Sequence, residues 1–167
     1  MNIPFRKKLF ELILLTVLGV VMYVSQVVMA PIPNVELVSL LIILVARKFK
    51  YKSLISVYIF VFCEIVTYGF SIWVVNYLYV WAVLAVVVCL VRKINNTFFY
   101  AFLSALYGMA FGTLCAIPYF FYGGFTFGIT YIANGLWFDL LHCGGNFIVA
   151  LVLYKPLTIA FDKVIKD

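Results

Sequence analysis

Three acidic side chains fall within or beside long apolar stretches, where an ionisable group is a candidate for function. They are Glu36, Glu64 and Asp139. His142 and Asn146 follow Asp139 at i+3 and i+7, so a helix would carry all three on one face. This face could bind a small molecule, or Asp139 and His142 could act as an acid–base pair. Simpler roles stay open: Glu36 could interact with a helix dipole, and His142 could pack in the core, hydrogen-bonded to Asp139.

Aromatic residues gather near the same positions and make up 19% of the chain. Tyr68 follows Glu64 by one helical turn, and Asn134 and Trp137 stand near the start of the stretch that contains Asp139. Belts of Tyr and Trp at bilayer surfaces are common, so any single ring has that simpler explanation. Rings and acids together, without a basic residue, favour a ligand that donates hydrogen bonds or carries positive charge.

The composition indicates what must position these side chains, since 67% of residues are hydrophobic and 11% are charged. Soluble domains contain about 45–50% apolar residues. We therefore predict an all-α membrane protein, with residues 1–167 forming a single integral membrane domain and a bundle of six transmembrane helices. One crossing needs roughly 20 residues. The predicted helices cover roughly residues 9–30, 35–47, 53–70, 76–91, 98–117 and 131–154, with a Gly-rich aromatic loop over residues 119–130.

The basic residues give the predicted helices an orientation. All 12 Lys and Arg residues precede the first helix, follow the last, or lie in the loops after the second and fourth. Lys and Arg concentrate in cytoplasmic loops, so both termini are predicted to be cytoplasmic. The net charge of +6 does not indicate a nucleic-acid partner, because the basic residues are scattered at helix ends and form no continuous stripe.

Other patterns exclude some chemistry and leave one packing question open. The chain has 4 cysteines but no CxxC or Cys–His metal spacing, and no Walker motif. We therefore expect no metal site and no ATP hydrolysis by this chain. A stripe of small residues at i+3/i+4 spacing could pack within the bundle or dock a partner subunit. Its members are Ala101, Ala105, Gly108, Gly112 and Ala116.

Two segments resemble a known family of membrane proteins. Residues 33–43 (PNVELVSLLII) are similar to the loop and second helix of the substrate-binding S-components of energy-coupling factor (ECF) transporters. Residues 138–142 (FDLLH), continuing through Asn146 to residue 157, are similar to their last helix. The first helix departs from the family's Ala-xxx-Ala docking signature, because residues 15–23 offer only Thr16 and Gly19 as small residues.

The resemblance implies a function, partners and a site. It implies high-affinity binding of a vitamin or related micronutrient for uptake, together with a transmembrane coupling subunit and two ATPase subunits. It also implies a multi-pass protein of a bacterial, Gram-positive cell membrane, with no enzyme activity or cofactor of its own. The site would lie in the outer half and would include Asn34, Glu36, Trp73, Asn76, Tyr77, Trp81, Asn134, Asp139, His142 and Asn146.

The lack of basic residues in the outer half restricts the cargo. Strongly anionic compounds would require Arg or Lys, so we expect a neutral or cationic heterocycle. A deazapurine such as queuine, a thiamine-type compound and a pyridoxine-like ring are the candidates. Two alternatives remain: an intramembrane enzyme that uses the Asp139 and His142 pair, and an accessory membrane subunit without a ligand.

Overall fold

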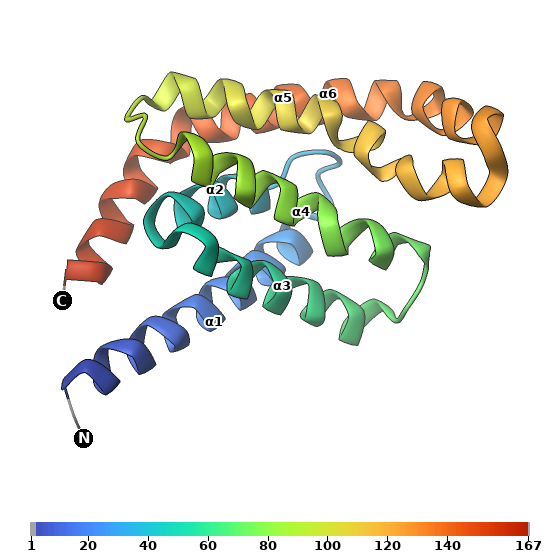
Figure 1. The fold of residues 1–167 in the computed structure, drawn as a ribbon. Coiled ribbons are helices and arrows are strands. Elements are labelled where there is room, and N and C mark those ends of the chain that lie inside the picture. The colour runs from blue at the N-terminus through green and yellow to red at the C-terminus, as the bar shows by residue number, and fades with distance from the viewer. Residues whose placement is uncertain (1–2, 167) are drawn as a thin grey trace.

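The computed structural model describes residues 3–166, and within them every regular element is a helix (Figure 1). The all-α prediction is therefore confirmed. In chain order the elements are α1 (Ile3–Met29), α2 (Val38–Phe49), the short 3₁₀ helix η1 (Lys50–Lys52), α3 (Ser53–Tyr68), α4 (Ile72–Val91), α5 (Thr97–Cys115) and α6 (Ile117–Lys166).

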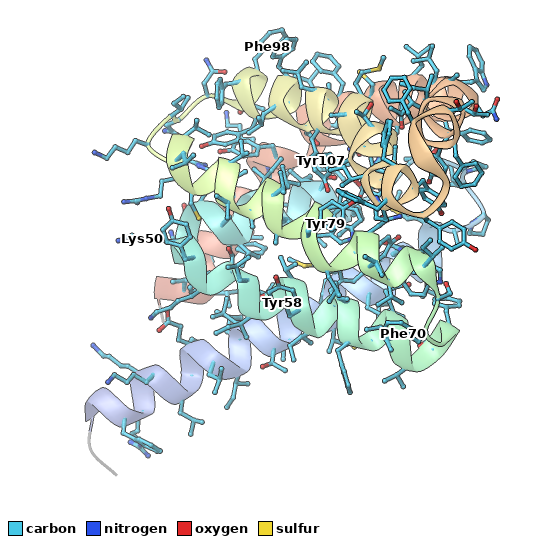
Figure 2. All side chains as sticks on the ribbon, turned by 45° about the vertical axis from the view of Figure 1, so that its right-hand side comes forward. Lys50, Tyr58, Phe70, Tyr79, Phe98 and Tyr107 are labelled. Atoms are coloured by element: carbon cyan, nitrogen blue, oxygen red, sulfur yellow. The ribbon has the colours of Figure 1, made fainter. Side chains whose placement is uncertain are left out.

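Four helices in the described part of the chain are long and apolar enough to cross a membrane, judged by length and composition. They are α1, α4, α5 and α6. The helices α2 and α3 have 12 and 16 residues. At about 1.5 Å per residue, α2 would extend only about 18 Å. Large apolar side chains are exposed on the outside of the protein, among them Phe98 at the start of α5 and Phe70 in the turn between α3 and α4, which are 61% and 76% exposed (Figure 2).

The segment 119–130, predicted as a loop, is helical, so that prediction was wrong. It belongs to α6, which has one break at Gly124, where φ is 78°. Glycine adopts this left-handed conformation without strain, and the chain folds back there (Figure 1). The return packs Tyr119 on Tyr131, with ring centroids 4.3 Å apart. The glycines and aromatic residues of this segment indicate a loop when read from the sequence, but in the structure they form a tight helical hairpin.

Other helix boundaries also differ from the prediction. The first helix begins at Ile3 rather than near residue 9, so Arg6, Lys7 and Lys8 lie in its first two turns instead of before it. The last helix does not end at residue 154 but continues through Pro156 to Lys166. An ion pair between Lys48 and Asp162 holds this extension against α2. The second helix begins at Val38 rather than near residue 35, and α4 begins at Ile72 rather than near residue 76. Residues 30–37 therefore form a longer connection than predicted.

The stripe of small residues on α5 packs against α6 inside the bundle. A Cβ atom on Gly108 would lie 2.8 Å from the carbonyl oxygen of His142, so only glycine allows this approach. Ala101 and Ala105 are buried as well. Of the two roles predicted for the stripe, internal packing is confirmed, and the buried stripe cannot serve as an external docking surface.

Gly19 permits a similar close approach of α1 to α3. A Cβ atom there would lie 2.6 Å from the carbonyl oxygen of Ser56 and 2.7 Å from Cβ of Ile59. We expect Gly19→Ala to lower the melting temperature in detergent, because overpacking costs about 1–3 kcal/mol and outweighs the gain of about 1 kcal/mol in helix propensity. Val20→Ala, on the exposed face of α1, is the control. An unchanged melting temperature for Gly19→Ala would contradict this packing.

Candidate functional site

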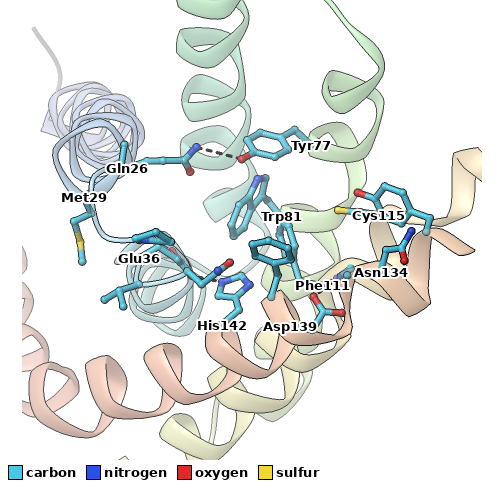
Figure 3. A pocket seen from close by; sticks show the side chains of 18 of the residues that line it. Gln26, Met29, Glu36, Tyr77, Trp81, Phe111, Cys115, Asn134, Asp139 and His142 are labelled. Atoms are coloured by element: carbon cyan, nitrogen blue, oxygen red, sulfur yellow. Dashed lines mark hydrogen bonds and ion pairs between the residues drawn. The ribbon is translucent and has the colours of Figure 1, made fainter.

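A cavity of about 710 Å³ lies between the end of α1, the connection 30–37, α4, α5 and α6 (Figure 3). This volume is in the range of small-molecule sites. Its lining residues are Gln26, Met29, Ala30, Ile32, Pro33, Asn34, Val35, Glu36, Tyr77, Trp81, Phe111, Gly112, Cys115, Phe127, Thr130, Tyr131, Asn134, Gly135, Phe138, Asp139 and His142.

The connection 30–37 forms one wall of the cavity and packs closely against α6. Asn34 has a φ of 61°, a conformation that Asn tolerates better than most residues. Its carbonyl oxygen would lie 2.7 Å from a Cβ atom on Gly145, so glycine lets this turn press against α6. Glu36 then stands just before α2, and its Oε2 accepts a hydrogen bond of 2.8 Å from the Ser39 amide. The predicted interaction of Glu36 with a helix N-terminus is present.

The second oxygen of Glu36 contacts His142. Oε1 lies 3.4 Å from Nε2 of His142, and both side chains are largely buried. This contact joins the start of α2 to the middle of α6. The predicted hydrogen bond between His142 and Asp139 is absent from the described residues, since the partner of His142 is Glu36.

Asp139 is held by α5 instead. Its Oδ1 accepts a hydrogen bond of 2.9 Å from the Gly112 amide, and the residue is 6% exposed. A Cβ atom on Gly112 would lie 2.5 Å from Oδ2 of Asp139, so the carboxylate rests directly on the α5 backbone. Asp139 and His142 thus face the same cavity with separate partners, and no hydrogen bond within the described residues links them as an acid–base pair.

Aromatic rings form the wall opposite α6. The Trp81 ring lies between Tyr77 and Phe111, with centroids 5.6 Å and 5.3 Å away. Phe111 in turn meets the His142 ring at 5.0 Å. Tyr77 accepts a hydrogen bond of 3.2 Å from Gln26, which links the wall to α1 (Figure 3). Such a wall offers flat apolar surface to a planar ligand.

The cavity lining contains acids but no Lys or Arg. The segments that carry the basic residues, including η1 and the turn after α4, gather with both chain ends on the left of Figure 1, and none of them lines the cavity. No group of three or more His, Cys, Asp or Glu side chains within residues 3–166 could hold a metal ion. The polar chemistry of the cavity is therefore that of acceptors and amides rather than of cations.

The structure brings together some of the predicted site residues and separates others. Those that line the cavity are Asn34, Glu36, Tyr77, Trp81, Asn134, Asp139 and His142. Those outside the lining are Glu64, Tyr68, Trp73, Asn76, Trp137 and Asn146.

Four of the six residues outside the lining fall into two groups, and a fifth, Trp73, is half-buried with its ring centroid 5.1 Å from that of Tyr77. Tyr68 and Trp137 are 56% and 67% exposed on the outer surface of the bundle. Asn76 is buried and accepts a hydrogen bond from Tyr79, while Asn146 donates to Ser39 and to the Ser104 carbonyl. Asn146 therefore connects α6 to α2 and α5, whereas the hydrogen bond of Asn76 stays within α4, and neither residue lines the cavity.

Glu64 is 3% exposed, and its Oε1 has no hydrogen-bond partner within the described residues. It lies on α3 one turn beyond Phe60, whose ring packs against Trp81 and Tyr77. Glu64 therefore lies on the helix that packs behind the aromatic wall, and it is not among the residues that line the cavity.

Sequence reasoning missed several residues that line the cavity, including Gln26, Met29, Phe111, Cys115 and Tyr131. Phe111 and Cys115 flank Gly112 by one and three positions on α5. Their signal was present, because the small-residue stripe marks where α5 meets α6. Gln26 had no signal, since nothing in its neighbours indicates that the end of α1 reaches α4.

Comparison with protein-family models, with curated proteins and with solved structures found no match to this chain.

Proposed function

We propose that this chain is the substrate-binding S-component of an ECF-type transporter, which captures a small heterocyclic micronutrient for uptake. The observation that supports this most is the cavity of about 710 Å³, lined by two carboxylates, one imidazole and several rings, and free of Lys and Arg. A pocket with these properties binds and orients a small molecule. In this proposal the chain is not an enzyme, and ATP is hydrolysed by two partner subunits that act through a transmembrane coupling subunit.

The proposed orientation follows from the basic residues. With Lys and Arg on the cytoplasmic side, both termini lie in the cytoplasm, and the cavity opens toward the outer half of a bacterial, Gram-positive cell membrane. Six helical crossings are proposed, of which α2 and α3 are the short ones. The short α2 is surrounded by other helices, because residues 38–46 are all buried, so it does not need to match the lipid thickness.

The charge of the cavity predicts the charge of the cargo. Glu36 and Asp139 repel anions, and no cationic side chain in the lining compensates for them. We expect the purified protein to bind a neutral or cationic heterocycle at least about 100-fold more tightly than an anionic vitamin, a difference of about 2.8 kcal/mol. Isothermal titration with thiamine, pyridoxine and 7-deazaguanine against pantothenate and biotin measures this.

The same titration decides between functions. Preference for pantothenate or biotin would contradict the proposed cargo class. Failure of every compound to bind, together with no small molecule detected by mass spectrometry of the purified protein, would favour an accessory subunit without a ligand. Conversion of a bound compound into product would favour an intramembrane enzyme.

A further inference from the structure

The carboxylate of Asp139 is fixed on one side and free on the other. Oδ1 accepts the Gly112 amide at 2.9 Å. Oδ2 has no hydrogen-bond partner within the described residues, although Asp139 as a whole is 94% buried, being 6% exposed. Asp139 lines the cavity, so an unpartnered carboxylate oxygen there can accept a hydrogen bond from a bound molecule. A ligand donor that enters the cavity could therefore pair with Oδ2.

The neighbours of Asp139 provide a place for a flat ring. Asn134, Gly135 and Phe138 line the cavity on the same face of α6. The side chain of Asn134 makes no hydrogen bond to the described residues, so its amide can donate to or accept from a ligand. Gly135 has no neighbour within 4 Å of the place its Cβ would occupy, so open space adjoins the carboxylate.

The chemistry of the carboxylate defines the matching edge. An ionised carboxylate accepts hydrogen bonds on two oxygens and pairs best with two parallel N–H donors. In a planar heterocycle, an amino group beside a ring N–H presents two such donors. A pyridoxine-like ring carries hydroxyl and hydroxymethyl groups instead and has no such pair.

We propose that Asp139 is the specificity-determining residue of the cavity, and that it selects a planar nitrogen heterocycle with an amino group beside a ring N–H. This inference rests on the proposed function, because it takes the cavity to be the ligand site. It separates the candidate cargoes, since a deazapurine with a guanine-type edge has this pair of donors. The adjacent rings of Trp81 and Phe111 would cover the flat faces, and Asn134 would meet a ring carbonyl.

A matched pair of probes tests the inference on the purified full chain. 7-Deazaguanine carries the amino group, and 7-deazahypoxanthine is the same bicycle without it. We expect isothermal titration to give at least about 10-fold tighter binding of 7-deazaguanine, as for one lost charged hydrogen bond. Asp139→Asn should reduce this preference to less than about threefold, because an amide has one acceptor oxygen. Glu64→Gln, behind the aromatic wall, should keep the preference.

The outcomes separate the inference from the function on which it rests. Equal binding of the two probes by the wild-type protein, tighter binding of pyridoxine, or an unchanged preference in Asp139→Asn would overturn the role of Asp139 while leaving a ligand site in place. Binding of none of the heterocycles would overturn both. Since the wild-type comparison needs no substitution, equal binding of the two probes would overturn the inference even if Asp139→Asn does not fold.

Discussion

Gly112→Ala is expected to weaken ligand binding by about 100-fold while leaving the helices in place. The added Cβ would lie 2.5 Å from Oδ2 and 2.7 Å from Oδ1 of Asp139, so the carboxylate must move away from the α5 backbone. Its hydrogen bond from the Gly112 amide would then be lost or distorted. A factor of 100 corresponds to about 2.8 kcal/mol, in the range of a lost hydrogen bond to a charged group plus a misplaced acceptor.

The controls for Gly112→Ala use the same chemical change elsewhere. Gly144→Ala places a Cβ where nothing lies within 4 Å, so binding should be unchanged. The double variant Gly112→Ala/Asp139→Ala removes the clash. Its melting temperature should therefore exceed that of Gly112→Ala, because both variants carry alanine at 112 but only the single variant has the clash with the carboxylate, while its affinity stays low. Wild-type affinity in Gly112→Ala, measured by isothermal titration, would contradict this account of the site.

The helical fold could be predicted from the sequence because its long apolar runs have few alternatives in a bilayer, where backbone groups must pair within the helix. The positions at which the helices begin and end were harder to predict from the sequence. Glycine and aromatic residues around Gly124 signal a loop in water, yet here they allow a helix to reverse and stack Tyr119 on Tyr131. The proline at 156 signals a helix end, yet the helix continues to Lys166, and its last turns pack near α2, where Asp162 pairs with Lys48.

Residues of the candidate site could be predicted from the sequence when a polar side chain is flanked by apolar residues on its own helix. Asp139, His142 and Glu36 were found in this way, and all three line the cavity. The same rule also selected Glu64, which is buried but lies outside the lining. Burial can be judged from a single helix, but which cavity a side chain reaches depends on the rotation of the neighbouring helices. For α3 that rotation is set by packing of Phe60 on Trp81 and Tyr77.

At the opposite end of the bundle from the cavity, Arg47 joins three parts of the chain. Its guanidinium lies over the rings of Tyr100 and Tyr154, 4.7 Å and 5.5 Å from their centroids. The two rings are stacked on each other at 5.1 Å. Arg47 also donates hydrogen bonds to the Tyr154 hydroxyl and to the carbonyl oxygen of Ile94. Arg47, near the end of α2, therefore contacts three other parts of the chain: the turn after α4, the start of α5 and the later part of α6.

Arg47→Met is expected to destabilise the protein by about 3 kcal/mol. It removes a cation–π contact worth about 0.5–2 kcal/mol and hydrogen bonds to a charged group worth about 1.5–3 kcal/mol, while methionine keeps much of the apolar volume. Thermal unfolding in detergent should show a clearly lower melting temperature. Lys93→Met, which removes an exposed charge in the same turn, should leave it within error. Equal melting temperatures for the two variants would mean that the Arg47 contacts do not hold the helices together. The basic residues at this end of the bundle would then serve only to orient the protein in the membrane.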